Sequence, residues 1–362
     1  MEKVRVGIIG CGGIANGKHL PALAKIPEVD IVAFCDIIVE RAEQAKEKYG
    51  TKDAKVYVDY RELVADSSVD AVHVLTPNDL HAPMTIAALE AGKHVMCEKP
   101  MAKTAAEARA MYEAAQRTGK LLTIAYQNRF REDAQYLYRA CRNGELGEIY
   151  FAKSHAVRRA AVPTWGVFLD AEAQGGGPLI DIGTHALDLT LWMMDNYEPK
   201  YAVGTTYRML ADNPDKALAN SFGPWDTKEF TVEDSAFGFI VMKNGATIFL
   251  ESSWALNTLE VGEAITTLCG TLGGADMRDG LRINGQKYGK HFVEKPQLGA
   301  SGVDFYQGET MSPGEREAQV FYDAILKGDP LVVEAAQALV VTEILEAIYK
   351  SAETGKPVFF EE

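Results

Sequence analysis

Cysteine is scarce in this 362-residue sequence, and its five copies form no pattern typical of a disulfide framework or a zinc site. Their number is odd, and no two have the C-x-x-C spacing of metal and redox sites. They stand at positions 11, 35, 97, 141 and 269. Isolated cysteines of this kind favour reduced thiols in a reducing compartment. We therefore expect no disulfide, no metal ion and a cytoplasmic protein.

Excess positive charge is also missing. Lysine and arginine number 37 against 51 aspartates and glutamates, which gives a net charge of −14. A surface of that sign repels nucleic acids and anionic membranes. No run approaches the roughly 18 apolar residues that span a bilayer, and the opening MEKVRVGIIG enters a strand pattern without the features of a signal peptide. We expect neither a nucleic-acid partner nor a membrane partner.

The sequence does contain a regular alternation of apolar runs and helical stretches up to residue 125. Hydrophobic residues make up 47% of the chain and charged ones 24%, as in ordinary globular proteins, and the length suits two domains. Continuous apolar strands separated by helices are typical of a parallel sheet covered on both faces. The expected strands lie at 4–10, 30–36, 69–77, 93–100 and 121–126. Residues 1–125 are therefore predicted to form a domain of the α/β class with a parallel sheet covered on both faces.

Residues 126–362 have a different hydrophobic pattern, with longer expected strands in which polar and apolar residues alternate. Asn244-Gly245 between two such strands is the strongest short signal for a hairpin. Ser312, with Pro313 after it and Glu315 three residues on, predicts the start of a helix. We expect an α+β domain with a mostly antiparallel open sheet and helices on one face.

A phosphate-binding loop is predicted where the first strand ends, because GCGGIA at 10–15 fits the pattern G-x-G-x-x-A. Gly10 permits a tight turn, Gly12 lets the backbone approach a pyrophosphate, and Ala15 lets the helix pack on the strand. The helix start then offers free N–H groups to the phosphates. We assign Gly10, Gly12, Gly13 and Ile14 to the cofactor site.

Asp36 ends the second expected strand, at the distance from the loop where an acid holds the ribose hydroxyls of the cofactor. Ile37 and Ile38 follow it, and no adjacent arginine or serine is present that could bind the 2′-phosphate of NADP. The simpler alternative is a turn glycine cluster with a surface aspartate. The strand before the loop and the helix after it favour the cofactor interpretation, with NAD preferred over NADP.

Two further motifs, TPNDLH at 76–81 and CEKP at 97–100, close neighbouring strands. Open α/β sheets bind ligands at the carboxyl ends of their strands. Pro100 biases Lys99 toward an extended backbone. His81 is expected either to order the cofactor loop or to make a simple hydrogen bond at a helix start. The cofactor candidates from these strand ends are Thr76, Pro77, Asn78, His81, Glu98, Lys99 and, after the last strand, Gln127.

The stretch GGGPLIDIGTHALD at 175–188 predicts an apolar helix with polar residues on one side. At about 100° per residue, Asp181, His185 and Asp188 fall within about 60° of one another. The three glycines before the helix would allow a ligand to approach the backbone. An alternative is that Asp181 caps the helix and His185 is an ordinary core histidine.

Taken in order, GCGGIA, Asp36, TPNDLH, GKHVMCEKP and GGGPLIDIGTHALD resemble the Gfo/Idh/MocA family of NAD(P)-dependent oxidoreductases over nearly the whole chain. The resemblance implies that residues 1–125 form a Rossmann NAD-binding domain and that residues 126–362 form a domain for substrate binding and oligomerisation, whose open sheet mediates oligomers. It also implies that Lys99, Asp181 and His185 form the catalytic site between the domains. We expect a homodimer or homotetramer.

The chemistry of these residues suits the oxidation of a secondary alcohol. Histidine can remove the hydroxyl proton as hydride leaves the same carbon for the nicotinamide. Lys99 can stabilise the developing alkoxide, and Asp181 can hold a neighbouring hydroxyl. Either His185 or Lys99 could take the proton, and we favour His185. Asp188 is expected either to orient the ring of His185 or to form a salt bridge.

A sugar, sugar derivative or cyclitol is the expected substrate, because the residues near the catalytic helix are polar. His155, Arg158 and Trp165 are the candidates for binding it. One alternative is a glycoside-processing enzyme that uses tightly bound NAD for transient oxidation at C3. Another is a non-catalytic dinucleotide sensor, although such a protein should have lost the lysine or the histidine. A biliverdin- or dihydrodiol-type reductase would instead predict an apolar site.

Overall fold

The computed structural model describes residues 3–299 and 311–360, which fall into two compact units. The first unit comprises Met1–Phe130 and Thr310–Leu339, and the second comprises Arg131–Glu309 and Val340–Glu362. The sequence prediction divided the chain once, after residue 125. The structure differs by adding 310–339 to the first unit, because Phe321 and Tyr322 pack into its core.

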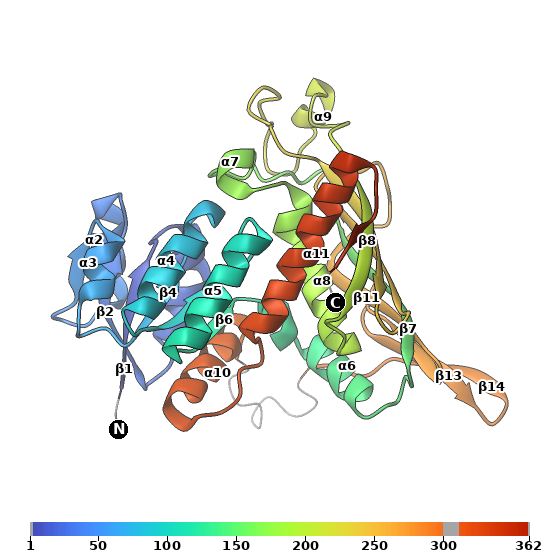
Figure 1. Cartoon of the computed structure of the whole chain (residues 1–362), viewed down its shortest axis with the longest axis horizontal. Coiled ribbons are helices and arrows are strands. Elements are labelled where there is room, and N and C mark those ends of the chain that lie inside the picture. Colours follow the sequence, from blue (N-terminus) through green and yellow to red (C-terminus); the bar gives the residue numbers. More distant parts are fainter. Residues whose placement is uncertain (1–2, 300–310, 361–362) are drawn as a thin grey trace. The chain divides into compact units, whose positions relative to one another are not determined.

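The first unit contains a six-stranded parallel sheet (Figure 1). Its strands are β1 (Val4–Ile9), β2 (Val29–Cys35), β3 (Lys55–Tyr57), β4 (Ala71–Val74), β5 (His94–Cys97) and β6 (Leu122–Ile124). They lie in the order β3-β2-β1-β4-β5-β6 and all pairs are parallel. This order is that of a doubly wound dinucleotide-binding sheet, so the predicted fold class of this part is confirmed.

Helices on both faces bury the apolar strands of this sheet. They are η1 (Ala15–His19), α1 (Leu20–Leu23), α2 (Val39–Tyr49), α3 (Tyr60–Ala65), α4 (Asn78–Glu90), α5 (Ala105–Thr118), η2 (Gln127–Phe130) and α10 (Pro313–Lys327). The expected capping box at the start of α10 is confirmed, since Ser312 Oγ accepts from the backbone N–H of Glu315 and the Glu315 carboxylate accepts from that of Ser312. An equivalent box of Thr104 and Glu107 starts α5.

The second unit is built on a nine-stranded sheet in the order β14-β13-β12-β11-β7-β10-β9-β8-β15. The strands are β7 (Ile149–Val157), β8 (Pro199–Tyr207), β9 (Ser235–Met242), β10 (Thr247–Ser253), β11 (Gly262–Gly270), β12 (Gly273–Asp276), β13 (Arg282–Lys287), β14 (Lys290–Glu294) and β15 (Val358–Phe359). Every neighbouring pair is antiparallel except β10 with β7. The expected mostly antiparallel sheet is confirmed, and the hairpin of β9 and β10 turns at Gly245 with φ +89°.

The helices of this unit are α6 (Glu132–Arg142), α7 (Ala171–Gln174), η3 (Leu179–Gly183), α8 (Thr184–Met194), α9 (Pro214–Leu218) and most of α11 (Ala335–Thr354). Helix α8 packs on β7 and β11. The ring of Phe249 on β10 contacts the rings of Phe151 on β7 and Phe239 on β9, which are among the alternate residues that share one face of the sheet. Phe249 is 44% exposed. Within residues 3–299 and 311–360, no helix is long and apolar enough to cross a membrane.

Candidate active site

The loop after β1 has two glycines that are required for different reasons. Gly10 has φ +91°, and a Cβ built there would collide with the carbonyl oxygen of Leu75. The protein itself therefore demands glycine at this position. A Cβ on Gly12 or Gly13 would meet no atom within 4 Å, so the backbone there faces open space. This bare backbone is the feature that a pyrophosphate needs for close approach.

Asp36 is held at the end of β2 by the loop that it faces. Its Oδ2 accepts from the backbone N–H of Cys11 at 2.8 Å, and its Oδ1 accepts from that of Ile38 at 2.8 Å. A carboxylate has about four lone-pair positions, so both oxygens keep capacity for ribose hydroxyls. Asn16, which the sequence analysis did not identify, donates from Nδ2 to the carbonyls of Cys11 and Gly12 at 2.9 and 3.0 Å and fixes the loop.

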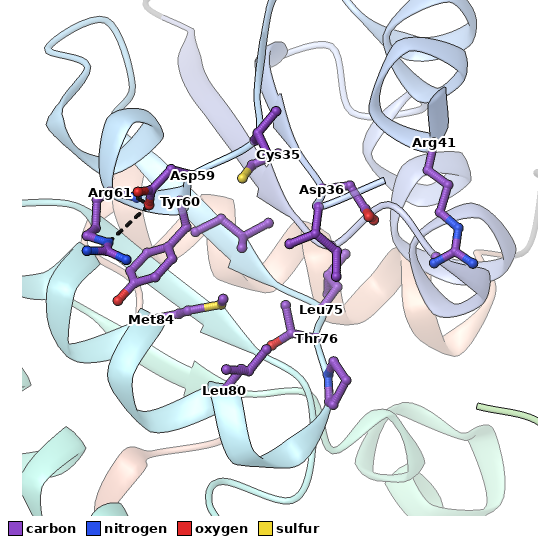
Figure 2. A pocket seen from close by; sticks show the side chains of 16 residues that line it. Cys35, Asp36, Arg41, Asp59, Tyr60, Arg61, Leu75, Thr76, Leu80 and Met84 are labelled. Carbon is purple, nitrogen blue, oxygen red and sulfur yellow. Dashed lines mark hydrogen bonds and ion pairs between the residues drawn. The ribbon is translucent and has the colours of Figure 1, made fainter. Parts of the chain in front are cut away.

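A cavity of about 580 Å³ lies beside these residues (Figure 2). Of the predicted cofactor residues, Gly10, Gly12, Asp36, Thr76 and Pro77 line it. Its remaining wall is largely apolar, formed by Ile9, Ile37, Val58, Leu75, Leu80 and Met84 together with the ring of Tyr60. A largely apolar slot that contains the fixed carboxylate of Asp36 fits the adenosine half of a dinucleotide.

Two arginines in this lining were missed by the sequence analysis. Arg41 stands on α2, and Figure 2 shows it on the Asp36 side of the cavity. Arg61 stands on α3, where its Nε lies 3.1 Å from Oδ1 of Asp59. Arg61 was missed because α3 had not been predicted. Arg41 lies in a stretch expected to be helical, but the side of α2 that faces the cavity depends on tertiary packing.

The other predicted cofactor residues lie at the same carboxyl ends of the strands without lining this cavity. Gly13 and Ile14 are exposed at the start of the first helix, Asn78 is buried at the start of α4, and Gln127 is half-buried at the start of η2. His81 is 1% exposed. Its Nε2 lies 2.9 Å from the carbonyl oxygen of Thr76 and its Nδ1 2.7 Å from that of Pro100. His81 therefore connects the segments that follow β4 and β5.

Glu98, next to the half-buried Lys99, is the end of a buried polar network. Its Oε1 accepts from Nζ of Lys18 at 2.9 Å and from Nε2 of His19 at 2.7 Å, and its Oε2 accepts from the backbone N–H of Lys99 at 3.1 Å. Lys18 also pairs with Glu317 of α10 at 3.0 Å. Burial opposes the charged form of Glu98, yet Lys18 and His19 hold its pKa well below the usual value.

The network continues from His19 into the core. Nδ1 of His19 lies 3.1 Å from Nδ1 of His73, and Nε2 of His73 lies 2.7 Å from the hydroxyl of Tyr322. Burial lowers the pKa of His73 well below its usual value, and burial together with Lys18 lowers that of His19. With both rings neutral and Glu98 ionised, one arrangement satisfies every atom. Tyr322 donates to His73, His73 donates to His19, and His19 donates to Glu98.

In the second unit, Asp181 and His185 lie on consecutive helical segments. Asp181 is in η3, a π-helical turn, and His185 is in the first turn of α8. The spacing of 100° per residue that the prediction assumed does not hold across this turn, because its hydrogen bonds run from i to i+5. Asp181 is 8% exposed, and its Oδ2 accepts from Nε1 of Trp254 at 3.0 Å. Asp188 is buried in α8.

A half-buried carboxylate anchors the glycines that precede η3. Glu233 accepts from the backbone N–H groups of Gly177 at 2.8 Å and Leu179 at 3.2 Å, and from the hydroxyl of Tyr349 at 2.8 Å. A Cβ on Gly176 would collide with Tyr349, and one on Gly177 would collide with the backbone of Glu233. At these two positions the expectation of a ligand against the backbone is corrected, because protein atoms occupy that space. Burial raises the pKa of Glu233.

The three candidates for substrate binding lie in different surroundings. His155 of β7 points to the face of the sheet away from α8, since its neighbours Ser154 and Ala156 are the buried ones, and its Nδ1 lies 2.7 Å from Oε2 of Glu251. The structure therefore does not bring His155 together with His185. Arg158 and Trp165 lie beyond the end of β7, and Trp165 is exposed.

Burial lowers the pKa of Arg158, while the carboxylates of Glu263 and Asp181 raise it, and the net shift is upward. Arg158 is thus within the electrostatic reach of Asp181. Its guanidinium forms two hydrogen bonds with Glu263, at 2.7 and 2.9 Å.

The chain is similar to known proteins in sequence and in fold. The chain is 34% identical to the D-glucoside 3-dehydrogenase of Escherichia coli over 98% of its own length and 97% of that protein. It is 32% identical to an inositol 2-dehydrogenase of Salmonella typhimurium over 53% of this chain and 55% of that one. A structure of levoglucosan dehydrogenase with NADH matches its fold with a TM-score of 0.82, at 23% identity, over 99% of each chain.

Two family descriptions cover most of the sequence. Residues 4–126 match the oxidoreductase family with the NAD-binding Rossmann fold, and residues 134–276 match the C-terminal domain of the same Gfo/Idh/MocA family. The loop at Gly10–Ala15 and Asp36 lie in the first match, and Asp181 and His185 lie in the second. The chain therefore belongs to the Gfo/Idh/MocA family of oxidoreductases.

Proposed function

We propose that this protein is an NAD-dependent dehydrogenase that transfers hydride between nicotinamide and a secondary hydroxyl of a sugar, sugar derivative or cyclitol. The observation that carries the proposal is that Lys99, Asp181 and His185 are all present and that two of them have dedicated supports. The backbone of Lys99 is tied to Glu98, and Asp181 is held by the indole of Trp254. A dinucleotide sensor would need none of these three side chains.

The preference for NAD rests on Asp36. Its two oxygens are fixed by backbone N–H groups and face the cavity that would take the adenosine, so ribose hydroxyls can donate to them. A 2′-phosphate would instead bring negative charge against this carboxylate. Arg41 supplies a cation in the same lining, but it is exposed, whereas Asp36 is buried. We therefore infer that NADP is the poorer cofactor.

Bound NAD would supply the hydride acceptor. Of the protein groups, His185 is the proton acceptor for the substrate hydroxyl, because a neutral imidazole is a competent base near pH 7. Asp181 would accept a hydrogen bond from a neighbouring hydroxyl, as an ionised carboxylate can. Lys99 carries the positive charge that stabilises an alkoxide. His155 is left out of the substrate site, since it lies on the other face of the sheet from α8.

The test is the replacement of His185 and Lys99 by alanine, measured on a panel of sugars and cyclitols by the absorbance of reduced nicotinamide. Removing a general base costs about 10²–10⁴ in rate, so we expect kcat to fall in that range for His185→Ala. NAD affinity, measured by calorimetry, should stay near the wild-type value. The exposed His291 of β14 is a matched control, and His291→Ala should change neither quantity. Near wild-type turnover in His185→Ala would contradict the assignment.

A further inference from the structure

Three aromatic side chains of the second unit form a partly exposed surface that we call the aromatic ledge: Trp165, Phe168 and Phe222. The ring of Trp165 stands edge-on to Phe168 at a centroid distance of 5.8 Å and to Phe222 at 5.0 Å. Trp165 is 53% exposed and Phe222 is 45% exposed. Such large apolar rings exposed side by side are uncommon on a soluble protein unless something binds there.

The aromatic ledge leads directly to Asp181. The ring of Phe168 is 6.4 Å from that of Trp254, which is fully buried. Nε1 of Trp254 donates to Asp181 at 3.0 Å. The ledge thus begins one ring away from the carboxylate proposed to bind the reacting sugar, and it extends from there to the surface.

The loops that carry the ledge are joined by a buried amide. Asn220 is 8% exposed, and it accepts from the backbone N–H of Val162 at 2.8 Å and donates to the carbonyls of Val162 and Gly223 at 2.9 and 2.7 Å. The hydroxyl of Thr164 donates to the carbonyl of Phe222 at 2.7 Å. Trp165 and Phe222 are therefore held in place before any ligand arrives, which lowers the entropy cost of binding.

Charged groups lie at the edge of this apolar surface. The guanidinium of Arg158 is 5.9 Å from the centroid of the Phe222 ring, and Glu263 fixes it there. A pyranose ring matches such a surface. Its C–H face carries partial positive charge that is attracted to the faces of aromatic rings, while its hydroxyls need donors and acceptors at the rim.

We propose that the aromatic ledge binds the second pyranose ring of a glycoside, so that the preferred substrate is a disaccharide and not a free monosaccharide. This inference rests on the proposed function, because it places the reacting ring at Asp181 and His185. The second ring would stack on Trp165 and Phe222, with its hydroxyls toward Arg158.

The test compares kcat/KM for a methyl glucoside with that for a glucose disaccharide whose non-reducing ring is the same sugar. Wild-type enzyme should favour the disaccharide. Trp165→Ala should lower the disaccharide-to-methyl-glucoside ratio by about tenfold, as expected for loss of an aromatic anchor, and Phe222→Ala should lower it in the same direction. Tyr288, which is 93% exposed on the hairpin of β13 and β14, is the control, and Tyr288→Ala should leave the ratio unchanged.

An unchanged ratio in both variants would overturn the inference, and so would an equal loss on the two substrates, which would assign Trp165 to the reacting ring. Calorimetry of the disaccharide with the cofactor-free protein gives a second measurement that does not depend on turnover. If the wild type oxidises no sugar, the proposed function fails. The ledge is then judged by whether Trp165→Ala weakens disaccharide binding in calorimetry, and equal binding by both proteins would refute it.

Discussion

Replacing Lys18 by methionine should destabilise the first unit by about 3–5 kcal/mol, the usual cost of removing one partner from a buried ion pair. Nζ of Lys18 lies 2.9 Å from Glu98 and 3.0 Å from Glu317. The three side chains are 13%, 8% and 4% exposed, so water screens them little. Methionine fills a similar volume without charge, and it would leave two carboxylates buried together without their shared cation.

The loss should depend on pH with a definite sign. Burial opposes ionisation of Glu98, but Lys18 and His19 hold its pKa well below the usual 4.5. A carboxyl with a lowered pKa contributes stability above its unfolded value and loses that contribution as pH falls through the folded value. Without Lys18 the pKa of Glu98 rises, because burial is then less opposed. The gap between wild type and Lys18→Met should therefore be larger at pH 8 than at pH 5.

Amide hydrogen exchange in β1 and β4 of the full chain is the appropriate assay. The four tryptophans all lie within Arg131–Glu309, so their fluorescence reports the second unit and not the first. Adding Glu317→Gln to Lys18→Met should recover part of the loss, since one carboxylate is removed. Lys25 offers a matched control, because it pairs with Glu315 at 2.6 Å but is 61% exposed. Lys25→Met should cost less than about 1 kcal/mol, and an equal effect of the two single variants would refute the reasoning.

Three further outcomes are expected. Burial keeps the pKa values of His19 and His73 below 6.5, so the folded state binds fewer protons than the unfolded chain, and stability present above pH 6.5 should be lost below it. Urea unfolding should show a slope of about 1.4 kcal/mol per pH unit for each histidine, and a flat profile would contradict the neutral network. Asp36→Ser with Ile37→Arg should shift the ratio of kcat/KM values from NAD toward NADP, and an unchanged ratio would show that Asp36 does not discriminate. Light scattering at micromolar concentration should give the mass of a dimer or tetramer joined through the sheet face opposite α8, whereas a monomer mass would rule this out.

Much of the fold could be predicted because its signals are local. The buried parallel strands are continuous apolar runs, and the start of α10 is specified by Ser312 and Glu315 within four residues. The strands that were missed lack such a signal. None of the three residues of β3 is fully buried, and all five of β14 are exposed, so no apolar pattern marks them.

The candidate site was predictable only as far as its motifs reach. The loop after β1 and Asp36 follow from their position in the chain. The partners that hold Glu98 do not, because Lys18 and His19 are 80 and 79 residues away from it and no local pattern links them. The π-helical turn at Asp181 has the same apolar residue types as an α-helix, so the sequence does not distinguish the two. The face of β7 that carries His155 depended on which side α8 covers, and only the packed structure shows this.

The contribution of α10 to the first unit has a consequence for the order of events during synthesis. The nucleotide-binding half leaves the ribosome first, but Phe321 and Tyr322 of its core follow only after Arg131–Glu309. At about 5–20 residues per second, that interval lasts on the order of ten seconds or more. Throughout it, His73 has no Tyr322 to donate to it, and Lys18 has only one of its two carboxylates. The growing chain must therefore carry an unfinished Rossmann core while the second unit is being made, and the two units reach their native state together late in synthesis.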